Sequence, residues 1–357
     1  MNYYKKESLF SILKERTNYT EFAYSDNENG SVIISEYGGR PLGIFPKLNS
    51  VSLLWINPHL KEILISNQRD IGGDRYWLSP ERRFFYRDPH NWEQWFCPTG
   101  LDPGYYDILK KSRTYCLLKS ELNLVDQITK EEYYGKIKRE ISLIEEPIKT
   151  NLAYVAIEYR DKCVIHKPDL KINGWSLATV ISGGRKNPGT VVIPTSADPK
   201  PLSYFRKIAK NRLNVGDNYV TFKIDVNDIY KLAIRPEDID FKRKSKIGYI
   251  LKIPDYQDYG FLVKLSDDIP KTQKECFDVA RDHPNGEIGV IQSYNSKSQN
   301  SNNLRYGEIE LQLNPFKTVK ENSIGISKHQ LVAYIGSRED ILYAVEKYLG
   351  VEDPFLF

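Results

Sequence analysis

The sequence predicts an all-β protein, a large antiparallel β-sandwich with short helices at its ends. From Tyr115 onward, short segments rich in β-branched and aromatic residues recur, and turn formers such as Asn173-Gly174 and Asn187-Pro188-Gly189 separate them. This spacing is typical of a sandwich or barrel and not of strands that alternate with crossover helices. Hydrophobic residues make up 40% of the chain, which is enough for a sizeable core.

We expect a single domain over residues 1–357, with its core between about residues 31 and 332. The length of 357 residues exceeds the usual size of one domain, but large all-β domains reach it. The strand series crosses the middle of the chain without a segment of linker-like composition. Nothing in the sequence therefore divides it.

The first elements mix a helix with strands. Residues 8–16 predict a short amphipathic helix with Leu9, Ile12 and Leu13 on one side. Asn29-Gly30 is a hairpin signal. The first predicted strands are 31–37, 42–45 and 51–56.

Residues 115–313 predict strands almost throughout. A polar run, 296–303, predicts a loop between the last two of them. The predicted strands are 115–125, 134–144, 151–159, 163–172, 176–181, 190–194, 219–224, 231–234, 246–253, 260–265, 288–294 and 307–313.

The end of the chain predicts a helix over residues 338–349. Ser337 is a good N-cap, two acidic residues follow in the first turn, and Gly350 suits the position after the last turn. The apolar stripe of this helix is Ile341, Leu342, Val345, Tyr348 and Leu349. We expect the helix to close one edge of a sheet.

Composition excludes several classes of function. A net charge of +4 is too small to indicate a nucleic-acid partner, and no apolar run approaches the roughly 20 residues of a membrane span. The N-terminus lacks the apolar core of a signal peptide. The four cysteines are scattered without metal-ligand spacing, so we expect a reduced, cytoplasmic protein without a metal or cofactor.

The most unusual stretch is 71–106. It begins with Gly72-Gly73 and then places Asp74, Arg75 and Glu81 among many aromatic residues, including Trp77. Aromatic rings cover the apolar faces of sugars, and charged groups bind paired hydroxyls, so this composition suits a polyhydroxylated ligand. The alternative is an aromatic loop that caps a sheet, with Asp74 and Arg75 merely paired.

A second group of polar residues lies in 305–313. Strand alternation puts Glu308, Glu310 and Gln312 on one face and their apolar neighbours on the other. An ordinary solvated face would look the same. If the face instead lines a cavity, the carboxylates repel each other and one pKa rises toward the range of a general base.

Familiar catalytic motifs are absent. The sequence has no GxSxG, no P-loop, no HExxH and no GxGxxG after a strand. The five histidines, His283 among them, are isolated in sequence, so a surface or core role is the first expectation for each.

Several segments together resemble a divergent branch of the galactose mutarotase-like (aldose 1-epimerase) superfamily. The segments follow the order of that superfamily between residues 31 and 316. They are Tyr37-Gly38-Gly39-Arg40, Ile71-Gly72-Gly73-Asp74-Arg75, Val290-Ile291-Gln292-Ser293-Tyr294-Asn295 and Ile309-Glu310-Leu311-Gln312. The resemblance implies a large antiparallel β-sandwich and a small carbohydrate as ligand.

The resemblance also implies roles for residues. It makes Glu310 the catalytic base with Glu308 beside it, and it assigns sugar binding to Asp74, Arg75, Trp77, Glu81, Arg40, Gln312 and His283. Trp77 would be the stacking platform. The superfamily's acid histidine is missing, because the corresponding segment is Asn173-Gly174-Trp175-Ser176-Leu177-Ala178.

Three hypotheses remain open. In the first, the protein is an aldose 1-epimerase-type isomerase with His283 or Glu81 as a substitute acid. In the second, it binds a sugar without catalysis. In the third, the sandwich binds a ligand other than a sugar. An acid across the pocket from Glu310 would favour the first, since ring opening needs a base at the anomeric hydroxyl and an acid at the ring oxygen. The sequence leaves the sugar and the oligomeric state open.

Overall fold

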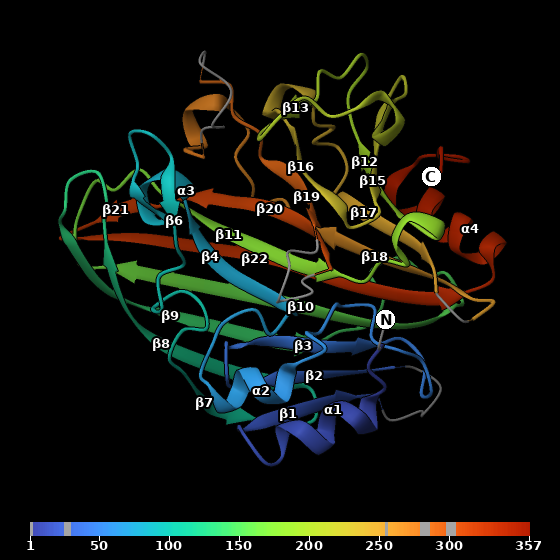
Figure 1. Cartoon of the computed structure of the whole chain (residues 1–357), viewed down its shortest axis with the longest axis horizontal. Helices are drawn as coiled ribbons and strands as arrows, with labels where there is room; N and C mark the ends of the chain where they lie inside the picture. The colour runs from blue at the N-terminus through green and yellow to red at the C-terminus, as the bar shows by residue number, and fades with distance from the viewer. Residues whose placement is uncertain (1–2, 25–29, 254–255, 279–285, 298–304) are drawn as a thin grey trace.

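The computed structural model describes residues 3–24, 30–253, 256–278, 286–297 and 305–357. Two large sheets pack face to face, and a three-stranded sheet lies at one side of them (Figure 1). Every strand pair in the described ranges is antiparallel. The predicted all-β class and antiparallel sandwich are therefore confirmed.

The larger sheet has eleven strands. Their order is β14-β15-β12-β17-β18-β22-β10-β9-β8-β7, and β21 pairs with β22. The strands are β7 (Tyr106–Lys111), β8 (Tyr115–Val125), β9 (Glu132–Leu143), β10 (Ala153–Ile165), β12 (Gly189–Pro194), β14 (Leu213–Val215), β15 (Tyr219–Ile224), β17 (Ser245–Lys252), β18 (Tyr259–Leu265), β21 (Lys317–Val319) and β22 (Asn322–Gly336).

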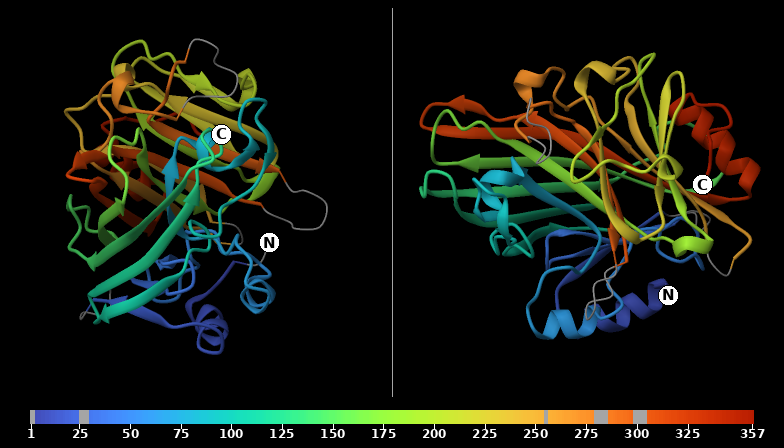
Figure 2. Two further views of the ribbon diagram at one scale, coloured as in Figure 1. Left: turned by 90° about the vertical axis from the view of Figure 1, so that its left-hand side faces the viewer. Right: turned by 45° about the horizontal axis from the view of Figure 1, so that its top comes forward.

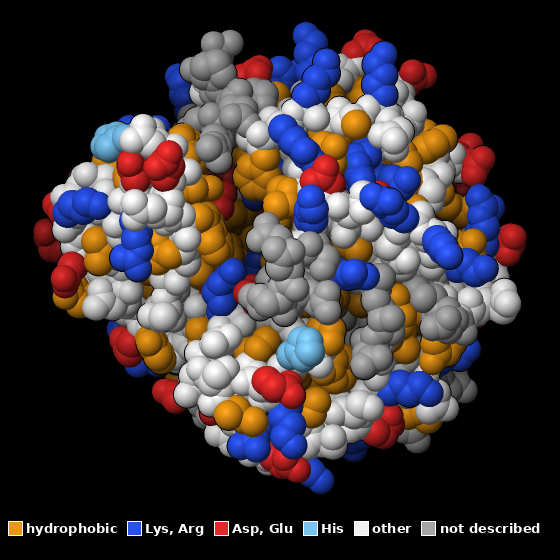
Figure 3. All heavy atoms as spheres, in the orientation of Figure 1, with side chains coloured by type: hydrophobic (Ala, Val, Ile, Leu, Met, Phe, Trp, Pro, Cys, Tyr) orange, Lys and Arg blue, Asp and Glu red, His pale blue; other side chains and the backbone are white. Residues whose placement is uncertain are grey.

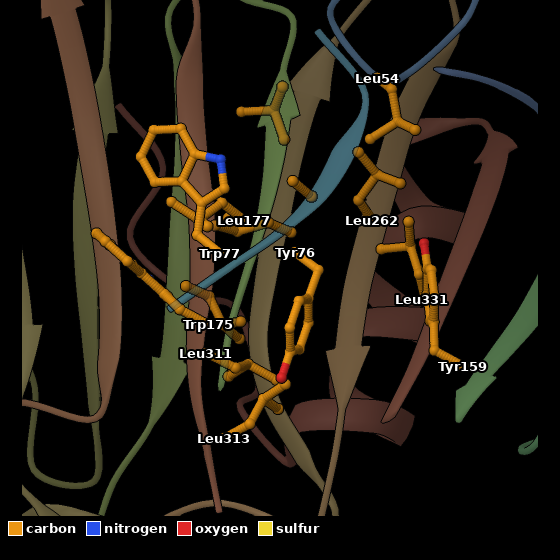
Figure 4. Close-up of a cluster of buried hydrophobic side chains, with 14 of the residues drawn as sticks. Leu54, Tyr76, Trp77, Tyr159, Trp175, Leu177, Leu262, Leu311, Leu313 and Leu331 are labelled. Carbon is orange, nitrogen blue, oxygen red and sulfur yellow. The ribbon is translucent and has the colours of Figure 1, made fainter. Parts of the chain in front are cut away.

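The smaller sheet has six strands in the order β13-β16-β19-β20-β11-β4. One of its faces packs on the larger sheet: Figure 4 shows Tyr76 beside Leu331 and Tyr159, with Trp77 on the other side of the same strand. The strands are β4 (Asp74–Ser79), β11 (Asn173–Val180), β13 (Leu202–Ser203), β16 (Asn227–Ile234), β19 (Ile291–Lys297) and β20 (Gly307–Pro315). Alternate residues of these strands therefore leave the core and form a second face.

The N-terminal region has a core of its own. Leu9 and Leu13 of α1 (Lys6–Leu13) and Leu60 of α2 (Leu60–Ile65) pack on Ile33 and Leu42 of the small sheet. This sheet consists of β1 (Tyr19–Ala23), β2 (Ser31–Ser35) and β3 (Arg40–Phe45). Both helices lie on its outer side (Figure 2).

Shorter elements complete the chain. The helix α3 (Glu81–Phe84) leads from β4 into the hairpin of β5 (Tyr86–Asp88) and β6 (Glu93–Trp95). The 3₁₀ turns are η1 (Gly184–Lys186), η2 (Lys210–Arg212), η3 (Pro236–Asp238) and η4 (Gln273–Glu275). Helices were expected mainly at the ends of the chain, so α2 and α3 are additions to that prediction.

The C-terminal helix α4 (Arg338–Leu349) has the predicted bounds and caps. Ser337 Oγ accepts a hydrogen bond from the backbone of Asp340 in a capping box, and Gly350 adopts a positive φ of 62°. The helix buries Ile341 and Val345 in a separate core with residues of β18 and β22. It packs on the outer side of the larger sheet (Figures 1 and 2).

Some strand predictions were wrong. Residues 151–172 were divided at the charged run 160–162, but β10 continues through it because Asp161 turns inward to Arg139. Residues 51–56 form only isolated bridges. The long β22 was missed, since small and polar residues occupy much of its inner face. Most of the expected turn before residue 30 and of the expected loop at 296–303 lies outside the described residues.

Candidate functional site

The second face of the smaller sheet carries charged and amide side chains. Glu308, Glu310 and Gln312 of β20 lie on this face, and Ile309 and Leu311 point into the core between the sheets. This is the alternation that the sequence predicted. All three polar residues are nevertheless buried, so the face is no ordinary solvated surface.

Two cations reach β20 from opposite sides. Arg75 extends from β4 across β11 and forms an ion pair with Glu308. Lys231 extends from β16 across β19, and its Nζ lies 3.1 Å from Oε2 of Glu310. At most 5% of any of these four residues is exposed. Each carboxylate therefore has its own cation in a largely water-free environment.

Glu310 is fully buried. Its Oε2 also accepts a hydrogen bond of 3.0 Å from Trp175 Nε1, but its Oε1 has no partner among the described residues. Burial raises the pKa of Glu310 to about 7; Lys231 opposes this increase and Glu308 adds to it. The sequence suggested repulsion between the carboxylates as the cause, but burial contributes more.

Aromatic rings line the site on the β4 side. The ring of Trp77 lies 4.7 Å from that of Phe85 and 5.7 Å from that of Trp175, and the Arg75 guanidinium covers it at 4.2 Å. Only 3% of Trp77 is exposed, so it does not offer the open ring face expected of a platform. Trp95 of β6 stacks on Phe85 and is 41% exposed, which makes it the accessible ring of the group.

Glu81 and Asp278 form a second polar wall. Glu81 Oε1 accepts a 3.0 Å hydrogen bond from Trp95 Nε1, and the backbone N–H of Glu81 donates to Asp278 Oδ1 at 2.9 Å. Asp278 Oδ2 also accepts a bond of 3.0 Å from Gln292 Nε2. Burial raises the pKa of Glu81, with Asp278 adding to the effect and Lys231 opposing it. Glu81 is thus a carboxyl group inclined to hold a proton.

Four buried polar atoms of this face lack a hydrogen-bond partner in the described part of the chain. They are Arg75 Nε, Trp77 Nε1, Glu310 Oε1 and Gln292 Oε1. A buried polar group without a partner costs about 1–3 kcal/mol. Two of these atoms are donors on β4, and two are acceptors on β19 and β20. A ligand with both hydroxyl donors and oxygen acceptors would form hydrogen bonds with all four.

Figure 3 shows a hollow in this side of the molecule. It lies between the region of α3, β5 and β6 and the region of β13 and β16, as comparison with Figure 1 shows. Hydrophobic side chains border the hollow, and charged side chains are visible inside it. The hollow therefore lies on the side of the molecule that carries the second face of the smaller sheet.

The predicted role of Asp74 at this site is wrong. Neighbouring residues of a strand point to opposite faces, so Asp74 lies between the sheets when Arg75 faces the site. There it contacts Lys264 Nζ and the Tyr159 hydroxyl, each at 2.8 Å. Burial would raise the pKa of Asp74, but Lys264 and other nearby cations outweigh it and lower the pKa.

Arg40 is also buried and has structural partners. It is 1% exposed, pairs with Asp102 Oδ1 at 2.6 Å and donates to the backbone oxygen of Gly38 at 2.9 Å. These bonds hold the turn between β2 and β3, and the predicted contact of Arg40 with a sugar stays a prediction. His283 lies outside the described residues.

Gln312 has structural partners on the site face. Its Oε1 accepts a 2.6 Å hydrogen bond from Ser79 Oγ, and its Nε2 lies 3.4 Å from Asp278 Oδ2. Gln312 therefore connects β20 to the wall of Glu81 and Asp278. Within the described ranges, no group of three or more His, Cys, Asp or Glu side chains is arranged to hold a metal ion.

Sequence reasoning missed five residues of this site: Lys231, Trp175, Trp95, Asp278 and Gln292. Lys231 gave a usable signal, because a lone cation inside the apolar strand 229–234 must find a buried partner. Trp175 lay in a segment considered for the family resemblance, and Gln292 lay in the predicted strand 288–294 without being singled out. Trp95 and Asp278 gave no signal that distinguishes them from other aromatic or acidic residues.

Fold and site together define an antiparallel β-sandwich with a buried polar pocket on one sheet face. A family model matches residues 3–352, and the chain belongs to this family, which is described as "Family of unknown function (DUF6786)". A search of curated proteins found no match. No helix in the described ranges is both long and apolar enough to cross a membrane.

Two solved structures are similar to this chain. One is a GalM/aldose epimerase homologue from C. elegans, with 10% identity and a TM-score of 0.44 over 90% of this chain and 99% of the other. The second is galactose 1-epimerase from Lactobacillus acidophilus, with 10% identity and a TM-score of 0.42 over 90% of this chain and 98% of the other.

Proposed function

We propose that this site binds a carbohydrate and interconverts its α and β anomers, as an aldose 1-epimerase-type isomerase does, with Glu310 as the base. The observation that carries the proposal is the buried Oε1 of Glu310, an acceptor without a partner among the described residues on a carboxylate whose pKa is about 7. A base with such a pKa is half ionised near neutral pH and suited to proton transfer.

The surrounding groups suit a sugar ring. Arg75 Nε and Trp77 Nε1 supply donors for a sugar oxygen, and Gln292 Oε1 supplies an acceptor for a hydroxyl. Glu308, held by Arg75, orients a neighbouring hydroxyl. Trp95 offers its exposed ring to the apolar face of the sugar.

Glu81 is the proposed acid. In the reaction, Glu310 removes the proton of the anomeric hydroxyl while Glu81 protonates the ring oxygen, so the ring C–O bond breaks and an open-chain aldehyde forms. Rotation about the adjacent C–C bond and closure in the reverse sense give the other anomer and return both protons. Lys231 stands in the electrostatic surroundings of both carboxylates and stabilises their charged forms.

Sugar binding without catalysis is the second candidate. It is favoured by Asn173, which stands in the segment where the superfamily has an acid histidine. The Nδ2 of Asn173 donates to the backbone oxygens of Glu275 and Leu313. No acid is therefore available at that position. The two candidates share the same pocket and differ in whether protons move.

Calorimetric titration with a panel of neutral hexoses and pentoses tests the binding they share. We expect at least one sugar to bind, and Glu310→Gln to weaken its Kd by about 10-fold, the scale of one charged hydrogen bond. Glu321→Gln, at an exposed turn, is the matched control and leaves Kd unchanged. Absence of binding across the panel, or a Kd insensitive to Glu310→Gln, contradicts the proposal.

A further inference from the structure

A separate cavity is lined by two residues, Pro80 and Phe277, that adjoin the polar wall of the proposed sugar site in sequence. Its volume is about 380 Å³, and its lining includes Pro80, Arg82, Arg83, Asp169, Lys171 and Phe277. Ligand pockets commonly measure about 300–1,000 Å³, so this cavity is large enough for part of a ligand.

The chain connects this cavity directly to the polar wall of the site. Pro80 immediately precedes Glu81, and Phe277 immediately precedes Asp278. The backbone of Glu81 donates to Asp278, so the two segments are joined where the wall stands. The lining of the cavity and the polar wall of the sugar site therefore share these two chain segments.

Positive charge exceeds negative charge in the cavity. Lys171 is exposed and has no ion pair or hydrogen bond among the described residues. Arg82 Nε donates to the backbone oxygen of Pro89, and the guanidinium lies over Trp92, but its terminal amino groups have no acceptor in the described part of the chain. The guanidinium of Arg82 is thus oriented and still available for a ligand.

The remaining charges do not cancel this excess. Arg83 pairs with Asp126 at 3.1 Å, outside the lining. Asp169 lines the cavity, and its Oδ1 accepts a 2.7 Å hydrogen bond from Thr318. Arg82 and Lys171 therefore stand against a single lining carboxylate that already has a partner.

Carboxyl groups outnumber cations at the sugar site. Among the described residues it holds four carboxyl groups, Glu81, Asp278, Glu308 and Glu310, and two cations, Arg75 and Lys231. The cavity, with its excess of positive charge, is therefore the more favourable of the two places for an anionic group.

We infer that the cavity binds an anionic group, a sulfate or carboxylate, and that the carbohydrate is acidic at a position outside the ring held over β20. The anion site rests on the cavity alone; its assignment to a carbohydrate rests on the proposed function. Arg82 and Lys171 recognise the anion through charge-assisted hydrogen bonds.

Titration with sodium sulfate at constant ionic strength tests the anion site without any sugar. Wild type is expected to bind sulfate saturably, and Arg82→Gln/Lys171→Gln is expected to lose this binding, as Lys171→Gln does in part. The control Lys149→Gln/Lys162→Gln changes two exposed lysines outside the cavity. It removes the same amount of charge, and sulfate binding is expected to remain. Absence of saturable binding, or equal binding by Arg82→Gln/Lys171→Gln, overturns the inference.

A pair of disaccharides tests the assignment to a carbohydrate. Glucuronosyl-glucose is expected to bind about tenfold more tightly than glucosyl-glucose, and Arg82→Gln/Lys171→Gln is expected to abolish the difference. Equal affinities in wild type overturn the assignment. If sulfate binds but neither disaccharide nor any sugar of the monosaccharide panel does, the proposed sugar function fails and the anion site stands.

Discussion

Glu310 combines three properties that determine its chemistry: full burial, a lysine partner and one oxygen without a partner in the described chain. Its raised pKa means that acid removes the base form. Anomer exchange should therefore rise with pH through about 7 and fall about tenfold for each pH unit well below that value. NMR measurements of the exchange rate between pH 5 and pH 9, roughly two units to either side of this pKa, test the prediction. A rate that does not change with pH would contradict it.

Lys231 should set the position of that pH profile. Its positive charge opposes the rise of the pKa of Glu310. Lys231→Met removes the charge and keeps much of the volume, so the pKa of Glu310 rises further and the midpoint moves to higher pH. The control is Lys149→Met at an exposed position. An unchanged or lower midpoint would show that Lys231 does not act on Glu310.

At the scale of single elements, β20 and β4 show what sequence can and cannot predict. The common face of Glu308, Glu310 and Gln312 follows from alternation within one strand, and it was predicted. Asp74 was misplaced because residues 71–106 were interpreted as an aromatic stretch and β4 was not recognised as a strand. Once β4 is a strand, alternation separates Asp74 from Arg75.

The meeting of Lys231 with Glu310 depends on the order of the strands. The two residues are far apart in sequence, and β19 separates their strands in the sheet. Local patterns do not determine that order. The charge of Lys231 indicated a buried partner, but only the assembled sheet identifies which carboxylate it is.

Between the sheets, β4 and β18 are joined by the ion pair of Asp74 and Lys264. Removing one partner of a buried ion pair leaves an uncompensated charge and costs about 3–5 kcal/mol. Lys264→Met should therefore lower the free energy of unfolding by that amount in urea denaturation. Asp74→Leu/Lys264→Met should lose less, because neither charge remains. A double variant that is no more stable than Lys264→Met would contradict this explanation.

The hairpin of β5 and β6 carries the exposed ring of the site. Trp95→Ala should weaken sugar binding by roughly 1 kcal/mol, since an exposed ring contributes stacking to the ligand and little to the core. The Tm of the free protein should hardly change. Calorimetric Kd and thermal unfolding measure the two effects, and Leu109→Ala, at another exposed apolar residue, is the control. A large loss of Tm with unchanged Kd would assign Trp95 to the fold alone.

At the scale of the whole molecule, the sandwich was predictable because short strands and turn formers recur along most of the chain. The three-stranded sheet with its own core and the long β22 were not. The inner face of β22 includes Ser323, Gly325, Ser327 and His329, which are not typical of a core strand. His329 is satisfied there by Asp161 of β10, a pairing that only the sheet creates.

The polarity of the interior is a property of the whole molecule too. One polar group lies between the sheets around Asp74, and another lies on the outer face of the smaller sheet around Glu310. The first has partners for both oxygens of its central carboxylate, whereas the second leaves Oε1 of Glu310 without one in the described ranges. The difference separates a network whose central carboxylate has all its partners from one that leaves an acceptor for the proposed ligand.

Exchange between α and β anomers, followed by NMR for wild type and Glu310→Gln, tests the central claim most directly. We predict that wild type accelerates exchange for a sugar that it binds and that Glu310→Gln reduces this acceleration by about a hundredfold or more, the usual scale of general-base catalysis. Affinity for the same sugar should change by only about 1–2 kcal/mol. If a sugar binds but its anomers exchange no faster than in buffer, the protein binds the sugar without catalysing the exchange, and the second candidate function holds. Acceleration that survives Glu310→Gln intact would contradict Glu310 as the base.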